Sequence, residues 1–200
     1  MSDEQRTKTV EYYNHYAEEW VATHGGLREK TWWADEVAHF HDLLPSGRVL
    51  EIGPGSGSDA AALIELGYEY VGVDASQILL HIAQARNPGA DLRLMDVLDL
   101  KSIDGRFDGF WAAAVLLHLP KTEIDRALRS LKSVMNPGAI GFISLKEGEG
   151  EQEDPGTGRW FAYYSRTEFS AVLESNGLEI VGKRTKLAQP NNWLVFYART

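Results

Sequence analysis

The feature that most constrains the fold is a set of three glycines at alternate positions, Gly53, Gly55 and Gly57. A short apolar run, Val49-Leu50-Glu51-Ile52, comes directly before them, and Ser58-Asp59-Ala60-Ala61-Ala62-Leu63-Ile64 comes directly after. Glycine permits positive φ and lets a ligand approach the backbone closely, and the first N–H groups of a helix have no partner within the helix. The stretch therefore predicts a strand, a tight turn and the start of a helix that faces a ligand.

A second apolar run, Tyr70-Val71-Gly72-Val73, ends in Asp74. This acid lies about 20 residues after Gly53, the offset at which nucleotide-binding folds place a carboxylate on the hydroxyl pair of a ribose. The dinucleotide fingerprint has its third glycine one position after Gly57, where this chain has Ser58. The two motifs together predict a ligand with free ribose hydroxyls, and the alternative is a turn that needs glycine only for packing.

Both motifs resemble those of the class I S-adenosylmethionine-dependent methyltransferases, of the small-molecule type. Glu51 and the three glycines match the family's first motif, Asp74 matches its second, and the order of elements matches over most of residues 35–200. The resemblance implies S-adenosyl-L-methionine as the cofactor and S-adenosyl-L-homocysteine as the product. The cofactor-binding residues that it implies are Tyr13, Trp20, Glu51, Gly53, Gly55, Gly57, Asp74, Ala75, Ser76, Met95, Asp96, Val97 and Ala113.

Some of these residues lie far from the glycine turn. The stretch from Tyr13 to Trp20 resembles the family's N-terminal helix, in which a tyrosine hydroxyl meets the cofactor carboxylate, although Asn14 replaces an aspartate of the family's pattern. An aromatic stripe that packs onto the domain is the alternative. Asp96 matches an acid that accepts from the adenine amino group, and the backbone N–H of Val97 would meet a ring nitrogen. The alternative for Asp96 is a surface turn.

His118 is the candidate general base. It follows the nearly all-apolar run 107–113, which predicts a buried parallel strand, and the loop that contains it resembles the family's loop after strand four. Ligands of open α/β folds bind at the carboxyl edge of the sheet, where this loop lies. A structural histidine is the alternative, because methyl transfer from a sulfonium often needs only positioning and a deprotonated acceptor.

Chain length and residue periodicity predict one α/β domain over 1–200. With the resemblance, its parts are a helical cap (1–45), a cofactor-binding core (46–145), a lid (146–165) and a C-terminal helix and hairpin (166–200). The predicted helices are 3–22, 30–44, 58–66, 76–86, 121–135, capped by Thr122, and 166–176. The predicted strands are 48–52, 69–73, 91–95, 107–113, 139–145, 178–186 and 193–198. The closing hairpin resembles that of the same family. This resemblance implies a Rossmann-like seven-stranded mixed sheet of strand order 3-2-1-4-5-7-6, with the last strand antiparallel and helices on both faces.

The segment 146–165 begins with an acidic, glycine-rich stretch that predicts a mobile loop. An arginine and several aromatic residues follow it, which is typical of a lid over a substrate. The alternative is a hydrophobic plug under the loop. The candidate substrate-binding residues are Lys146, Arg159, Tyr163 and Tyr164.

Composition limits the partners. The net charge is −9, which argues against binding to the phosphates of nucleic acid. The chain has no cysteine, so disulfides and thiolate metal sites are excluded, and no metal ligand cluster is predicted. No apolar run approaches the roughly 20 residues of a membrane span, and the polar start lacks the core of a signal peptide. We expect a cytoplasmic monomer or homodimer with a small-molecule acceptor and no membrane partner.

The sequence thus predicts an enzyme that transfers a methyl group from S-adenosyl-L-methionine to an oxygen or nitrogen of a small molecule. One alternative is an NAD-dependent oxidoreductase with a Rossmann domain. Another is a protein that binds S-adenosyl-L-methionine without catalysis. A third is a methyltransferase that acts on a basic protein or a carrier protein.

Overall fold

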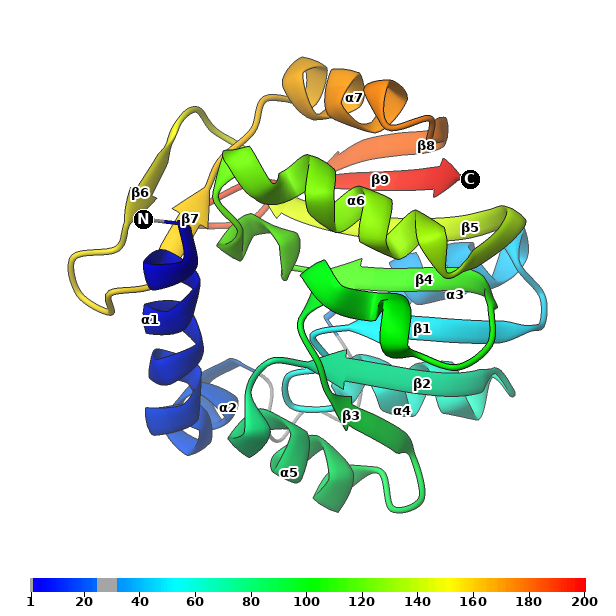
Figure 1. Ribbon diagram of the computed structural model, residues 1–200, viewed down its shortest axis with the longest axis horizontal. Coiled ribbons are helices and arrows are strands. Elements are labelled where there is room, and N and C mark those ends of the chain that lie inside the picture. Colours follow the sequence, from blue (N-terminus) through cyan, green and yellow to red (C-terminus); the bar gives the residue numbers. More distant parts are fainter. Residues whose placement is uncertain (1, 25–31) are drawn as a thin grey trace.

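Seven strands form one mixed sheet in the order β3-β2-β1-β4-β5-β9-β8 (Figure 1). The computed structural model describes residues 2–24 and 32–200. The strands of this sheet are β1 (Arg48–Ile52), β2 (Glu69–Asp74), β3 (Asp91–Leu94), β4 (Phe107–Ala113), β5 (Met135–Lys146), β8 (Glu179–Lys186) and β9 (Trp193–Arg199). β9 runs antiparallel to both of its neighbours, and the other adjacent strands are parallel. Because β8 and β9 are the sixth and seventh strands of this sheet, the predicted order and the antiparallel last strand are confirmed.

Helices cover both faces of the sheet, as predicted. The α-helices are α1 (Ser2–His15), α2 (Ala17–His24), α3 (Ala34–Leu43), α4 (Ser58–Glu65), α5 (Gln77–Arg86), α6 (Ile124–Ser133) and α7 (Arg166–Ser175). Three short 3-10 helices are η1 (Val97–Ser102), η2 (Leu116–His118) and η3 (Lys121–Glu123). Side chains of α3 and α4 pack with one face of the sheet, and those of η1, α6 and α7 pack with the other. α1 lies across the carboxyl ends of the parallel strands (Figure 1).

The two faces of the central strands explain the two layers of core. In β1, Leu50 and Ile52 point into the layer under α6, whereas Val49 points into the layer under α3 and α4. Trp111 of β4 is fully buried in the second layer and stacks on Phe142 at 3.8 Å between ring centroids. Strands that are covered on both sides become apolar on both sides, which is why their sequences lack a polar face.

Three predicted elements differ from the structure. The helix predicted over 3–22 is bent at Tyr16 into α1 and α2. Thr122 does not cap a helix, because the 3-10 turn η3 precedes α6 and Glu123 occupies the N-cap position without a side-chain bond. β5 begins at Met135, so the residues 136–138, which lie between the predicted helix 121–135 and the predicted strand 139–145, belong to the strand. The helix predicted over 30–44 begins partly outside the described residues, which resume at residue 32.

The segment predicted as a mobile loop contains a second, two-stranded sheet. β6 (Glu151–Glu153) pairs antiparallel with β7 (Trp160–Ala162), and the backbone N–H of Trp160 donates to Thr9 Oγ1 of α1 at 2.9 Å. The hairpin therefore reaches the N-terminal helix at the carboxyl edge of the main sheet (Figure 1). No helix in the described ranges is long and apolar enough to cross a membrane.

Candidate functional site

A cavity of about 1170 Å³ lies where the parallel strands end and α1 and α2 cross them. Its walls come from the turns after β1 and β2, from the ends of β3, β4 and β5, and from the hairpin β6–β7. The structure brings most of the predicted site residues into this one cavity. They are Tyr13, Trp20, Gly53, Gly55, Asp74, Ala75, Met95, Asp96, Val97, Ala113, His118, Lys146 and Arg159.

The glycine turn after β1 contains two glycines with different roles. Gly55 has φ +55°, and a Cβ built there would lie 3.3 Å from the Trp20 ring, on the cavity side. Gly57 has φ +77° and caps α4, but a Cβ built there would meet the Asn87 amide at 2.5 Å, away from the cavity. Gly55 therefore keeps the cavity wall open to a ligand, whereas Gly57 is required for packing against the loop after α5.

Asp74 ends β2 and faces the same turn. Its Oδ1 accepts from the backbone N–H of Ser76 at 2.8 Å. Burial raises the pKa of Asp74 to about 6, and backbone N–H groups of Ser76, Gly55 and Ala75 limit the rise. The carboxylate is thus held by backbone donors at the cavity wall, and it is charged at neutral pH.

The acid that was expected to meet adenine has an ion-pair partner. Oδ1 of Asp96 accepts from the backbone N–H of Leu98 at 2.9 Å, and Oδ2 pairs with Arg6 of α1. Arg6 also pairs with Glu123 at 2.8 Å. Each carboxylate oxygen has two acceptor positions, so Asp96 keeps acceptor capacity toward the cavity.

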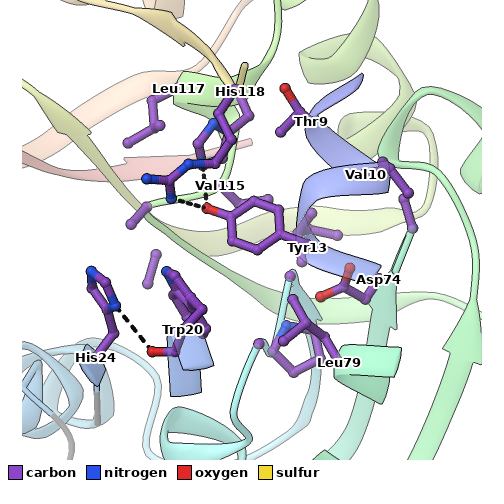
Figure 2. Close-up of a pocket in the computed structure, with 18 of the residues that line it drawn as sticks. Thr9, Val10, Tyr13, Trp20, His24, Asp74, Leu79, Val115, Leu117 and His118 are labelled. Carbon is purple, nitrogen blue, oxygen red and sulfur yellow. Dashed lines mark hydrogen bonds between the residues drawn. The ribbon is translucent and has the colours of Figure 1, made fainter. Parts of the chain in front are cut away.

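Tyr13 of α1 connects the loop after β4 with the hairpin (Figure 2). Its hydroxyl lies 2.9 Å from His118 Nε2, and His118 Nδ1 lies 2.8 Å from the carbonyl oxygen of Trp160. A carbonyl oxygen only accepts, so Nδ1 carries the proton and Nε2 accepts from the Tyr13 hydroxyl. Nη1 of Arg159 donates to the same hydroxyl at 3.1 Å. Three segments distant in sequence therefore meet in one chain of hydrogen bonds.

The electrostatics of this chain keep both aromatic groups neutral. Burial, aided by the positive charges of Arg159 and Lys146 and opposed by the bond to the Trp160 carbonyl, lowers the pKa of His118 to about 3. Burial also raises the pKa of Tyr13 above its usual value, although Arg159 opposes the rise. His118 lines the cavity, but the lone pair of its Nε2 already accepts a hydrogen bond from the Tyr13 hydroxyl.

The remaining predicted residues lie outside the cavity lining. Glu51 is buried and accepts from the Tyr70 hydroxyl, and burial raises its pKa well above the usual value. Ser76 caps α5 by accepting from the backbone N–H of Leu79 at 3.2 Å. Tyr163 packs over Gly148, and Tyr164 is buried with its ring 5.0 Å from that of Phe169. Glu51, Gly57 and Ser76 therefore support the walls, and the two tyrosines form the base of the hairpin.

Sequence reasoning missed two parts of the wall. Arg6 could not be assigned because its partners, Asp96 and Glu123, lie far along the chain and only the fold brings them together. Trp193 lines the cavity together with the loop before it, which contains Pro190. Trp193 meets Trp32 and Trp33 there, and this meeting depends on the pairing of β9 with β5.

Comparisons with known proteins find a methyltransferase domain in the central part of the chain. Residues 49–138 match the family model of the methyltransferase domain. The chain is 29% identical over 103 residues to a putative methyltransferase, YqeM, of Bacillus subtilis, an alignment that covers 49% of this chain and 42% of that protein. It is 29% identical over 106 residues to the ubiquinone biosynthesis O-methyltransferase of Xanthomonas campestris, which covers 50% of this chain and 44% of that protein. The chain thus spans less than half the length of these curated relatives.

The fold has close structural neighbours as well. One is the 1,6-didemethyltoxoflavin-N1-methyltransferase of Burkholderia thailandensis, solved with 1,6-didemethyltoxoflavin and S-adenosylhomocysteine bound. The TM-score to it is 0.71 at 22% identity, with 96% of this chain and 90% of that chain covered. Residues 49–138 thus match a methyltransferase domain, and the curated relatives and the shared fold support a class I S-adenosylmethionine-dependent methyltransferase.

Proposed function

We propose that this chain transfers a methyl group from S-adenosyl-L-methionine to an oxygen or nitrogen of a small molecule. The observation that carries the proposal is the meeting of Asp74, Asp96 and the Gly53–Gly55 turn around one cavity at the carboxyl ends of the strands. The family match over residues 49–138 supports it.

The residues present fit this cofactor. Asp74 lines the cavity and would accept from a ribose hydroxyl pair, and Gly55 has no side chain between the turn and the cavity. Met95 and Val97 give an apolar wall on either side of Asp96, which suits a flat base whose amino group needs an acceptor. Trp20 closes the cavity over Gly55. The cavity volume of about 1170 Å³ leaves space for an acceptor beside such a ligand.

The bound cofactor would supply an electrophilic methyl group on a positively charged sulfur. The chain's own contribution is to hold donor and acceptor in line, which can remove several kcal/mol of the barrier. The contacts of α1 and the hairpin with the strand ends would exclude water from the reacting atoms.

His118 was predicted as a general base, and we keep this as part of the proposal in a restricted form. Nε2 of His118 is the unprotonated ring nitrogen, and a base needs such a lone pair. The Tyr13 hydroxyl, however, already donates to it. A proton from the acceptor could reach His118 only if the Tyr13 hydroxyl passes it on or moves away. An acceptor that is already deprotonated would need neither step.

Calorimetry with S-adenosyl-L-methionine, S-adenosyl-L-homocysteine and NAD tests the binding part. We expect the first two to bind and NAD not to bind at the same concentrations, whereas NAD binding of comparable strength would favour the oxidoreductase alternative. Release of S-adenosyl-L-homocysteine with a panel of acceptors tests catalysis. Tight binding with no release across small-molecule, basic-protein and carrier-protein acceptors would favour a protein that binds without turnover.

A further inference from the structure

Two cations, Lys146 and Arg159, line the cavity at the end of β5 and on the hairpin. Within the described ranges, neither Lys146 nor Arg159 has a carboxylate oxygen within the 4.0 Å of an ion pair. The ammonium of Lys146 lies 3.9 Å from the centroid of the Phe161 ring, and Arg159 donates to Tyr13 and to Thr157. The other cavity-lining cation at this edge, Arg6, is paired with acids. This protein carries a net charge of −9, so two unneutralised cations at one end of a cavity call for an anion.

The nearest acid does not supply that anion. Asp154 lies on the same hairpin and acts electrostatically on both cations, but its carboxylate accepts from Gly156 and Thr157. Burial lowers the pKa of Lys146, and the positive charge of Arg159 lowers it further. An anionic ligand between the two cations would relieve both effects.

Indole rings lie beside the two cations. Trp193 pairs directly with Lys146 across β5 and β9, so both side chains leave the sheet on the same face. The Trp193 ring lies 5.8 Å from that of Trp32 and 5.7 Å from that of Trp33, between centroids. All three rings line the cavity, and Trp32 is 37% exposed at its rim. Aromatic walls of this kind favour flat apolar ligands.

These residues lie on the acceptor side of the cavity. Asp74 ends β2 and Lys146 ends β5, and the order β2-β1-β4-β5 separates them by three strand spacings, roughly 14 Å. Trp193 belongs to β9, one strand farther. The cations and indoles therefore lie beyond the part of the cavity proposed for the nucleoside.

We propose that the acceptor is a planar aromatic acid whose carboxylate lies between Lys146 and Arg159 and whose ring lies against Trp193 and its neighbours. This inference rests on the proposed methyltransferase function and names the class of its substrate. A carboxylate could also come from the methionine part of the cofactor, since Arg159 contacts Tyr13, so the experiment separates the two sources.

The test is calorimetry with the full chain saturated with S-adenosyl-L-homocysteine and three matched probes. These are 2-naphthoate, its neutral amide 2-naphthamide, and the saturated acid decahydro-2-naphthoate. We expect 2-naphthoate to bind at least tenfold more tightly than either control, because the amide lacks the charge and the saturated acid lacks the flat ring. Equal affinities for acid and amide, or no binding of the acid, would overturn the inference.

Substitutions of Lys146 and Arg159 test whether the carboxylate of the probe lies between these two side chains. Lys146→Met and Arg159→Met are expected each to reduce the acid-over-amide preference at least fivefold while leaving affinity for S-adenosyl-L-homocysteine within twofold. Lys183→Met is the control, because Lys183 donates to Ser170 and lies outside the cavity lining. If Lys146→Met instead weakens S-adenosyl-L-homocysteine as much as it weakens 2-naphthoate, the anion is the cofactor's carboxylate and the inference is wrong.

The titration with S-adenosyl-L-homocysteine alone decides the proposed function separately. If it does not bind, the proposed function fails, and the three probes are then compared on the protein without it. The acid-over-amide preference and its loss in Lys146→Met still support or overturn the aromatic-acid site in that case.

Discussion

The hydroxyl of Tyr13 lies 2.9 Å from Nε2 of His118, although 105 positions separate the two residues along the chain. This contact joins α1 to the loop after β4, and Arg159 of the hairpin donates to the same hydroxyl. The N-terminal helix is thus bonded to the side of the cavity that would hold the acceptor, and its hydrogen bonds can be tested one at a time.

Removing the Tyr13 hydroxyl should destabilise the fold. In Tyr13→Phe the buried Nε2 of His118 loses its donor, and an unsatisfied buried polar group costs about 1–3 kcal/mol. Urea unfolding measures the change in the free energy of unfolding. Tyr16→Phe is the control, because Tyr16 is 44% exposed and its substitution should change stability by less than about 0.5 kcal/mol. Equal small effects of both substitutions would show that the Tyr13–His118 bond contributes little.

Stability should fall in mild acid because of His118. Its pKa is about 3 in the folded chain, against about 6.5 when unfolded, so only the unfolded state takes up this proton between those values. Its contribution is therefore intact above pH 6.5 and is lost as pH falls toward 3, by at most about 1.4 kcal/mol per pH unit. Between pH 6.5 and 5, the free energy of unfolding should depend less on pH in His118→Gln than in the control His81→Gln, whose site is exposed. Parallel curves for the two variants would contradict the assignment.

The affinity for S-adenosyl-L-homocysteine should depend on the charge of Asp74. Asp74→Ala should weaken binding by about 1.5–3 kcal/mol, the range for hydrogen bonds to a charged group, with the fold retained. Because burial raises the pKa of Asp74 to about 6, binding to the wild type should also weaken as pH falls below 6. Calorimetry at pH 7.5 and 5.0 measures both effects, and Asp74→Asn should remove the pH dependence. Unchanged affinity with a much lower melting temperature in Asp74→Ala would make Asp74 a structural residue.

Alanine substitutions at two glycines with positive φ, Gly55 and Gly67, can distinguish backbone strain from loss of ligand contact. Gly55 and Gly67 have φ of +55° and +87°, but a Cβ at Gly67 would meet nothing within 4 Å, whereas one at Gly55 would reach toward the cavity and Trp20. Both alanine substitutions should lower stability by about 1–2 kcal/mol through left-handed strain. Only Gly55→Ala should weaken S-adenosyl-L-homocysteine, by tenfold or more. Similar binding losses in both variants would indicate a general effect of destabilisation.

The sheet and the meeting of Gly55 and Asp74 at one cavity were predictable because short-range patterns determine them. Gly55 and Asp74 each stand at the end of an apolar run, and parallel strands bring such ends to one edge. The closing hairpin, β8 and β9, was predictable from two strand-like runs with a turn between them. The ribose-side prediction therefore needed no contact between distant residues beyond strand pairing.

The lid side was harder to predict because its contacts are non-local or its pattern is weak. All residues of Glu151–Glu153 are exposed, so β6 shows no alternation of apolar and polar residues that could identify a strand. The turn Asp154-Pro155-Gly156 was a usable signal for a hairpin, and Ser165 with Glu168 was a visible capping box for α7. Nothing local in the sequence indicated that Tyr13 would bond to His118.

Three ion pairs help to fasten helix α1 to the rest of the molecule, beside the hydrogen bonds of Thr9 and Tyr13. Arg6 pairs with Asp96 and Glu123, and Lys8 pairs with Glu153 of the hairpin at 3.2 Å. Dissolved ions screen exposed charges beyond about 8 Å at physiological ionic strength, and over shorter distances in stronger salt. Added salt would therefore weaken the exposed pair of Lys8 and Glu153, whereas the largely buried pair of Arg6 and Glu123 would be screened much less. The residence time of a bound ligand would then shorten with rising electrolyte concentration to the extent that it depends on the contact between α1 and the hairpin.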